Sequence, residues 1–326
     1  MKTFYKYMSY STLREFLNDP CLRLTPSNCQ NDPFEFGFSS SDIDALNCKS
    51  NSKELGGNLE YFARLHGIIS LTTLNDDILM WSHYAGNHSG AVVEICIDDE
   101  NPQSLFINST GPNSPPFNYQ DFIFDKVLYK SLRRFESIDS ETNLDKIKNH
   151  YYFTKAQQWE PENEYRFIIP MTWINKILFN EDGYKKAQEI LGDYASSITC
   201  LSPADSGCKD YELDAATLEM ISALNPELLL KLWVQSRKNE TMFFIRLNSF
   251  DSSVSNGHIG RIFLGCQADH DDFISLLKND SDDPFHSIRS KYSRLFTGEI
   301  CNVFKGEMDK NEYKLLFKPL VGNLHA

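Results

Sequence analysis

Short apolar stretches of strand length, separated by helical and polar segments, are the feature that most restricts what this chain can fold into. Segments in which β-branched, aliphatic or aromatic residues follow one another are expected as strands, namely residues 67–72, 91–97, 165–169, 242–246 and 259–264. Segments of helical character are residues 11–17, 78–85 and 141–159. The Ser/Asp-rich residues 39–53 are expected to be loop or mobile. No internal repeat is visible, so the pattern predicts a single mixed α+β domain over residues 1–326, with a helix-rich insert at about 183–236.

Composition excludes several classes of protein. A chain of 326 residues that is 41% hydrophobic can bury a large core, which excludes disorder of the chain as a whole. Lys and Arg number 32 against 45 Asp and Glu, and the net charge of −13 excludes a general phosphate-binding surface. No apolar run approaches the roughly 18 residues of a spanning helix, the N-terminus lacks the apolar stretch of a signal peptide, and no cysteine pair has C-x-x-C spacing. We therefore expect a soluble, cytoplasmic protein with reduced cysteines and no membrane partner.

The first polar segment with candidate chemistry is the turn Asn31-Asp32-Pro33-Phe34-Glu35. Proline stiffens this turn, and it carries two carboxylates, Asp32 and Glu35. An Asx turn that caps the next element has the same composition. The segment is therefore either a pair of functional carboxylates or a structural turn.

The second segment is Met80-Trp81-Ser82-His83-Tyr84, inside the expected helix. Trp81 and Tyr84 stand at positions i and i+3, so they share a helix face. An aromatic face of this kind can hold a planar ligand, and a buried aromatic stripe has the same spacing.

The third segment is Trp159-Glu160-Pro161-Glu162-Asn163-Glu164-Tyr165-Arg166. Three acids within five residues repel one another unless cations or ligand hydroxyls compensate them. If the strand begins here, alternation puts Glu162 and Glu164 on the same side. Such a pair can do proton or carbocation chemistry, and a solvated charge cluster is the structural alternative.

Several familiar catalytic motifs are missing from the sequence. It contains no G-x-x-x-x-G-K-[ST] phosphate loop, no G-x-G-x-x-G after a strand and no G-x-S-x-G nucleophile elbow. Acids and histidines of suitable type for a metal are present, but no ligand spacing such as H-E-x-x-H occurs. We therefore expect no bound metal.

The segments described above resemble those of a bacterial family catalogued as domain of unknown function 2971. The matching residues are Tyr5-Lys6-Tyr7, Asn31-Asp32-Pro33-Phe34-Glu35, Ser70-Leu71-Thr72, Leu79-Met80-Trp81-Ser82-His83-Tyr84-Ala85, Thr154-Lys155, Trp159-Glu160, Glu164-Tyr165-Arg166 and Ile262-Phe263-Leu264-Gly265. This resemblance spans roughly residues 4–278, and the family name implies no activity.

A more distant resemblance is to the ADP-ribosyltransferases. A strand at 67–72 precedes a helix with Ser82 and Tyr84, and a later strand opens with Asn163-Glu164-Tyr165, in the order of the conserved blocks of that superfamily. Glu162-Asn163-Glu164 also has the E-x-E form of one of its branches, whereas Lys6-Tyr7 stands where Arg or His is usual. The resemblance implies a split mixed β-sheet core with peripheral helices, and NAD as substrate.

The resemblance also implies roles for particular residues. Glu164 is the catalytic carboxylate, which hydrogen-bonds the ribose 2′-OH and faces the developing positive charge, and Glu162 positions or deprotonates the acceptor. The Tyr84 ring faces the cationic nicotinamide, with Trp81 as the second candidate. The other implied residues are Lys6 and Tyr7 at the adenosine ribose or diphosphate, Ser70 and Ser82 in support of the cofactor site, and Asp32, Glu35 and His83 on the acceptor side.

These observations favour an NAD-dependent ADP-ribosyltransferase that modifies a protein or nucleic acid, as a toxin or antiphage effector with an antitoxin or chaperone as partner. Three alternatives stay open. The first is an NAD glycohydrolase, in which water replaces the acceptor. The second is metal-dependent hydrolysis of a nucleic acid or phosphoester through Asp32, Glu35, His83 and Glu164. The third is a sensor module that binds a ligand without turnover.

Overall fold

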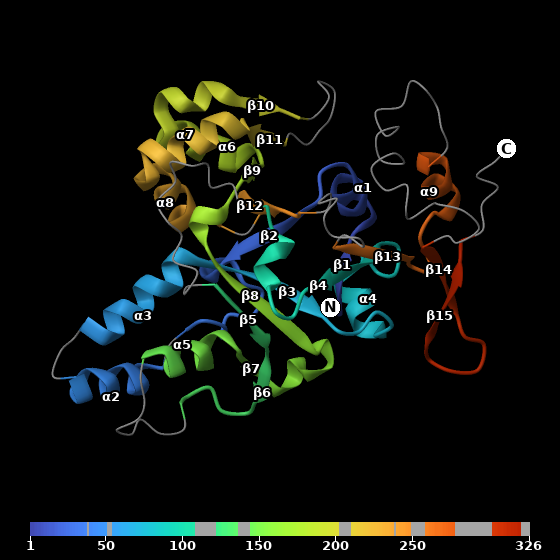
Figure 1. Cartoon of the computed structure of the whole chain (residues 1–326), viewed down its shortest axis with the longest axis horizontal. Coiled ribbons are helices and arrows are strands. Elements are labelled where there is room, and N and C mark those ends of the chain that lie inside the picture. The colour runs from blue at the N-terminus through green and yellow to red at the C-terminus, as the bar shows by residue number, and fades with distance from the viewer. Residues whose placement is uncertain are drawn as a thin grey trace.

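The computed structural model describes residues 1–37, 39–50, 54–107, 122–135, 144–201, 210–237, 239–248, 258–277 and 302–320. Its main feature is a thirteen-stranded sheet, in which a path of eleven strands has the order β10-β11-β9-β12-β2-β3-β1-β4-β13-β14-β15 and β8 joins β5 to β3 (Figure 1). Pairing is antiparallel except between β13 and β14, so the sheet is mixed and the predicted α+β class is confirmed. The strands of this sheet are β1 (Lys2–Met8), β2 (Cys21–Pro26), β3 (His66–Thr72), β4 (Ala91–Ile97), β5 (Ile123–Lys126), β8 (Glu164–Pro170), β9 (Lys176–Phe179), β10 (Ile198–Cys200), β11 (Tyr211–Leu213), β12 (Thr241–Arg246), β13 (Ile259–Leu264), β14 (Val303–Met308) and β15 (Leu315–Pro319).

The sheet forks beside the centre of β3. One edge of β3 pairs with β8 along its whole length, from His66↔Pro170 to Thr72↔Glu164. The other edge pairs with β2 at Gly67 and Ile68, and with β1 only at Thr72. If both ladders continued, Arg23 of β2 and Tyr7 of β1 would each face Ser70. Two strands cannot occupy one edge position, so β1 turns toward β4, β2 turns toward β12, and a gap opens between them.

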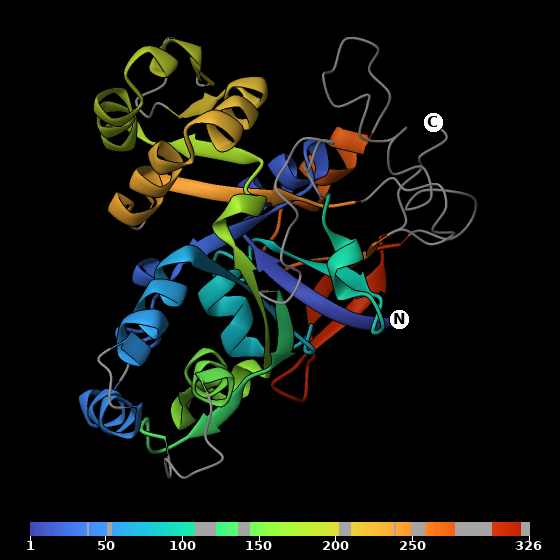
Figure 2. The same ribbon diagram turned by 60° about the vertical axis from the view of Figure 1, so that its left-hand side comes forward.

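The helices form separate groups around this sheet. In Figures 1 and 2, α6, α7 and α8 gather with β9–β11 at one end of the molecule, and α2, α3 and α5 lie together at another. Asp77 caps α4, since its side chain accepts the Met80 N–H at 2.8 Å. The helices are α1 (Tyr10–Asn18), α2 (Ser40–Ser50), α3 (Glu54–Leu65), α4 (Ile78–Tyr84), α5 (Leu144–Tyr152), α6 (Glu181–Leu191), α7 (Ala215–Leu224), α8 (Pro226–Gln235) and α9 (His270–Leu277), with the short 3₁₀ turns η1 (Ser27–Cys29), η2 (Pro102–Leu105), η4 (Gln157–Glu162), η5 (Met171–Trp173) and η6 (Gly192–Ser197). No helix in the described part of the chain is long and apolar enough to cross a membrane.

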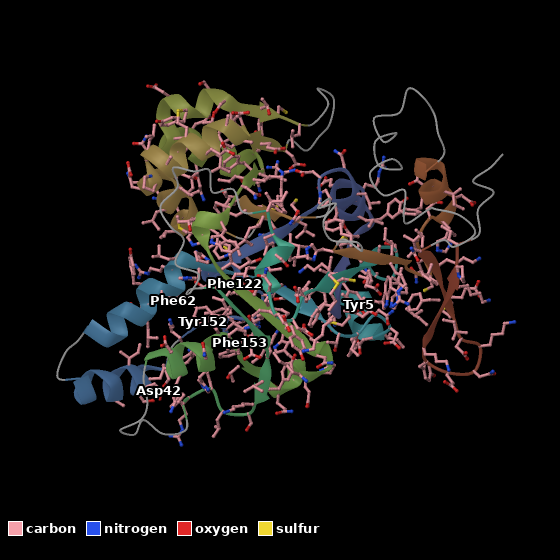
Figure 3. The ribbon with its side chains drawn as sticks, in the orientation of Figure 1. Tyr5, Asp42, Phe62, Phe122, Tyr152 and Phe153 are labelled. Atoms are coloured by element: carbon pink, nitrogen blue, oxygen red, sulfur yellow. The ribbon has the colours of Figure 1, made fainter. Side chains whose placement is uncertain are left out.

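Buried residues from distant segments make up the core. The largest cluster joins Phe4 of β1 and Phe167 of β8 to Trp233 of α8. A smaller cluster joins Tyr152 and Phe153, at the end of α5, to the sheet, and Figure 3 shows both side chains near Phe62 of α3. The sheet is therefore covered on the α3–α5 side as well as on the α8 side.

Two sequence predictions about local structure are wrong. Residues 40–50, expected as loop or mobile, form α2, because Asp42 accepts the Tyr151 hydroxyl at 2.5 Å and the Phe135 N–H at 2.8 Å and so ties the helix to its neighbours; residues 51–53 lie outside the described residues. The helix expected over residues 141–159 ends at Tyr152, since the chain then forms the strand β7 (Thr154–Ala156), which pairs in parallel with β6 (Leu128–Lys130), and continues as η4. Residues 141–143 lie outside the described residues.

Candidate functional site

A cavity of about 240 Å³ lies at the fork of the sheet, between β1, β2, β3 and β8 and beneath α4 and η4. Its lining carries four cationic side chains and four carboxylates, so its formal charge is zero in a protein of net charge −13. These eight residues are Lys6, Arg23, Lys155 and Arg166, and Asp32, Glu35, Glu162 and Glu164.

The register of β3 against β8 places polar side chains on one face. Thr72 is opposite Glu164, and Ser70 is opposite Arg166. Side chains two residues apart in a strand point to the same face, and so do side chains directly opposite in an antiparallel pair. All four residues line the cavity.

A buried network of ion pairs holds the three glutamates of the cavity. Glu164 accepts from Arg166 Nε at 2.7 Å, from Arg166 Nη2 at 3.0 Å and from Lys155 Nζ at 3.2 Å. Glu35 contacts the same two cations at 3.0 and 3.1 Å, and Glu162 contacts Lys155 at 2.6 Å. None of the five side chains is more than 12% exposed, so each charge depends on its partners for stabilisation.

The network determines the protonation state of Glu164. Burial raises the pKa of this carboxyl, but the charges of Arg166 and Lys155 and the hydrogen bonds outweigh burial and hold the pKa at about 2. Burial likewise lowers the pKa of Lys155, and the surrounding glutamates raise it by more. Glu164 is therefore a fixed, ionised carboxylate at neutral pH.

Tyr84 joins the network through its hydroxyl, which donates to Glu162 Oε1 at 2.6 Å. Burial and the neighbouring Glu162 raise the pKa of the Tyr84 hydroxyl, so it keeps its proton at neutral pH. The tyrosine ring projects from α4 into the lining of the cavity and is held in place at its far end.

Glu162 and Glu164 are brought together as predicted, although strand alternation is not the reason. Glu162 ends η4, and Glu164 begins β8. Between them Asn163 takes a left-handed conformation, with φ 42° and ψ 52°, and its side chain donates to Thr73. This turn lets both carboxylates reach the ammonium group of Lys155.

Lys6 and Tyr7 of β1 both line the cavity. Lys6 Nζ donates to the Ser70 carbonyl at 2.9 Å and so bridges the gap where the backbone ladder is open. Burial lowers the pKa of Lys6 to about 8, despite the opposing effect of Glu164. The ring of Tyr7 packs edge to face on Trp81, with centroids 5.5 Å apart.

The structure does not place Trp81, Ser82 and His83 in the cavity. Trp81 is fully buried, its Nε1 donates to the Asn75 carbonyl at 2.8 Å, and it packs in the cluster between α4 and the sheet. His83 is exposed, and neither His83 nor Ser82 lines the cavity. The cofactor contacts predicted for Trp81 and Ser82 and the acceptor contact predicted for His83 therefore stay predictions, and of the helix residues predicted for the site only Tyr84 lines this cavity.

Asp32 and Glu35 both lie at the cavity. Asp32 Oδ1 accepts the Phe34 N–H at 2.8 Å, so this residue forms the Asx turn that was the structural alternative, and it also lines the cavity. A second cavity of about 190 Å³ shares Asp32, Glu35 and Lys155 with the first. Asp32, Glu35 and Lys155 therefore lie between the two neighbouring cavities.

Sequence reasoning missed the two central cations, Lys155 and Arg166, and also Arg23. A signal for the first two was present, since three clustered acids need compensating cations and both residues lie in the segments that resemble the 2971 family. Tyr129 was missed as well, and its hydroxyl accepts the Glu164 N–H at 2.8 Å. Nothing in the local sequence around Arg23 or Tyr129 points to the cavity.

The described residues include no group of three or more His, Cys, Asp or Glu arranged to hold a metal ion. The three glutamates of the cavity contact Lys155 and Arg166 instead.

Residues 80–167 match the family model described as "Protein of unknown function (DUF2971)". This segment holds the Tyr84 ring and four network residues, namely Lys155, Glu162, Glu164 and Arg166, whereas Lys6, Arg23 and Glu35 precede it. No curated protein and no solved structure matches the chain.

Proposed function

We propose that this chain is an NAD-dependent ADP-ribosyltransferase. The observation that carries the proposal is the neighbour order β8-β3-β1, which assembles residues from three distant segments around one cavity. Lys6 of the first strand, Ser70 of the middle strand and Glu164 of the later strand are the residues that the superfamily resemblance implied. They meet where the sheet forks, next to the Tyr84 ring.

The reaction breaks the bond between ribose C1′ and the nicotinamide nitrogen, and the bonding electrons leave with neutral nicotinamide. The ribose then carries oxocarbenium character, as in glycoside cleavage. The nucleophile of the acceptor forms the new bond to C1′ and loses its proton to a base. A fixed, ionised carboxylate beside C1′ stabilises the positive charge, and loss of one such preorganised group costs on the order of 10²–10³ in rate.

The surrounding residues suit the remaining tasks. The Tyr84 ring offers an aromatic face for the pyridinium, an attraction of about 0.5–2 kcal/mol. Glu162 accepts the Tyr84 hydroxyl and so orients this ring, and in this proposal its carboxylate is also the base that takes the proton of the acceptor nucleophile. The second cavity borders Glu35 and Lys155, so a macromolecular acceptor reaches the site from that side in this proposal.

Nicotinamide release from NAD by purified protein tests the proposal. We expect Glu164→Gln to lower the rate by about 10²–10³, and Tyr84→Ala to lower it far more than Tyr84→Phe, which keeps the ring. Glu160→Gln is the matched control, because Glu160 is exposed, lies outside the cavity lining and accepts with its side chain from Gln157 Nε2. Thermal unfolding of each variant shows that the fold is intact.

Added cell lysate or RNA separates the acceptor classes. Radiolabelled ADP-ribose bound to a protein or RNA fraction, dependent on Glu164, identifies a transferase and its acceptor. Free ADP-ribose as the sole product identifies a glycohydrolase. No nicotinamide release under any condition, or release at the wild-type rate by a folded Glu164→Gln variant, contradicts the proposal.

A further inference from the structure

Two cations face the gap in the forked sheet from opposite sides. Lys6 lies on β1 and Arg23 lies on β2, and both line the cavity. Continued ladders would bring Arg23 and Tyr7, the neighbour of Lys6, opposite the same residue, Ser70. Because β1 and β2 diverge from the same edge of β3, the side chains of Lys6 and Arg23 lie near each other.

Within the described part of the chain, neither cation forms a direct ion pair with a carboxylate. No carboxylate of the described residues lies within 4.0 Å of a nitrogen of Lys6 or Arg23. Lys6 donates to the Ser70 carbonyl, and Arg23 Nη1 donates to Asn239 Oδ1 at 2.9 Å. The Arg23 Nε is buried and has no hydrogen-bond partner among the described residues.

The acids of the cavity are already engaged elsewhere. Glu35, Glu162 and Glu164 contact Lys155 or Arg166, and Asp32 accepts a backbone N–H. Burial lowers the pKa of both Lys6 and Arg23, and at Lys6 the more distant charges of Glu164 and Glu162 oppose burial without outweighing it. A buried, unpaired cation is costly, and an anion between the two side chains removes that cost.

We propose that Lys6 and Arg23 form a binding site for a diphosphate, held in the fork between β1 and β2. Arginine presents a planar set of donors that matches phosphate oxygens, and lysine adds a point charge, so the pair spans two adjacent phosphate groups. That the diphosphate is the one of NAD rests on the proposed function. Arg23 then determines recognition of the phosphorylated ligand and takes no part in bond cleavage.

Calorimetric titration with inorganic pyrophosphate tests the site without any turnover. We expect pyrophosphate to bind the wild-type protein, and to bind Arg23→Gln about 10- to 100-fold more weakly, since a hydrogen bond to a charged group is lost. The pyrophosphate affinity of Arg23→Lys should lie between those of the wild type and Arg23→Gln. Arg237→Gln is the matched control, because Arg237 is exposed and outside the cavity, and its affinity should equal that of the wild type.

The outcomes separate this site from the proposed function. No pyrophosphate binding by the wild type, or equal binding by wild type and Arg23→Gln, overturns the diphosphate site. Pyrophosphate binding that depends on Arg23 supports the site even if NAD is never cleaved, and that result refutes the proposed function alone. Nicotinamide release with an unchanged KM in Arg23→Gln leaves the proposed function intact and overturns the assignment of Arg23.

Discussion

Replacement of Lys155 by methionine removes an ammonium group that contacts three buried glutamates. Its Nζ lies 2.6 Å from Glu162, 3.1 Å from Glu35 and 3.2 Å from Glu164, and the lysine side chain is only 9% exposed. Methionine keeps much of the volume of the side chain and removes its charge. Among the described residues, Glu35 and Glu164 then keep Arg166 as an ion-pair partner and Glu162 keeps none, so the protein must either bury excess negative charge or bind protons.

The structure gives the size of the effect. The fall of the Glu164 pKa from 4.5 to about 2 corresponds to about 3 kcal/mol of net stabilisation of the ionised form, which remains after burial has opposed the charges of Arg166 and Lys155 and the hydrogen bonds. Removing one partner of a buried ion pair costs about 3–5 kcal/mol, and we expect Lys155→Met to fall in this range at pH 7. For a chain of 326 residues that loss corresponds to a Tm lower by about 4–7 °C.

The destabilisation should also depend on pH. In the wild type the lowered pKa of Glu164 adds stability above the unfolded-state value of about 4.3, and this stability is lost as the pH falls toward 2. Without Lys155 the pKa of Glu164 rises, so the folded variant takes up a proton at a higher pH than the wild type does. The difference in free energy of unfolding between wild type and variant should therefore shrink between pH 7 and pH 4.

Chemical and thermal unfolding followed by tryptophan fluorescence measures both quantities. Lys185→Met is the control, since Lys185 contacts two carboxylates, Glu181 and Asp182, but is 61% exposed, and exposed pairs contribute about 0–1 kcal/mol. A loss for Lys155→Met no larger than that of the control would refute the reasoning. A loss that is equal at pH 7 and pH 4 would also refute it, because the glutamates would then not carry the uncompensated charge.

Two further predictions concern the turn at Asn163 and the charge of Lys6. Asn163→Val should destabilise the fold by about 1–3 kcal/mol and lower nicotinamide release, because a β-branched residue resists φ 42°. Asn163→Gly should keep more activity than Asn163→Val. Equal unfolding midpoints for Asn163→Val and the wild type would contradict this prediction. Because the pKa of Lys6 is about 8, its charge is lost as the pH rises from 7 to 9, so pyrophosphate affinity of the wild type should fall relative to that of Lys6→Arg over this interval. A constant ratio of the two affinities across that interval would show that Lys6 does not contact the anion.

Local sequence patterns anticipated much of the site. The polar segments around Asp32, Tyr84 and Glu164 stood out because charged and aromatic residues follow one another there without the periodicity of a buried face, and each contributes to the lining of the cavity. Strand and helix periodicity likewise predicted β3, α4, β4 and β8. Such features depend on residues close together in the chain, so the sequence alone can express them.

Other features depend on contacts between distant segments. Trp81 and Tyr84 share a helix face and similar chemistry, yet the packing of α4 on the sheet buries Trp81 fully and turns Tyr84 to the cavity. Residues 40–50 form a helix because Tyr151, more than a hundred residues later, meets Asp42.

The sequence by itself determined the central strands β3, β4 and β8, the helix α4 and the acids that compose the candidate site, because hydrophobic period and residue type are local properties. Only the tertiary structure decided which charges pair. Lys155 and Arg166 bind Glu35 across more than a hundred residues, and Arg23 enters the cavity because β1 and β2 compete for one edge of β3. Pairing across such distances follows from sheet register, and register is set by the packing of the whole core.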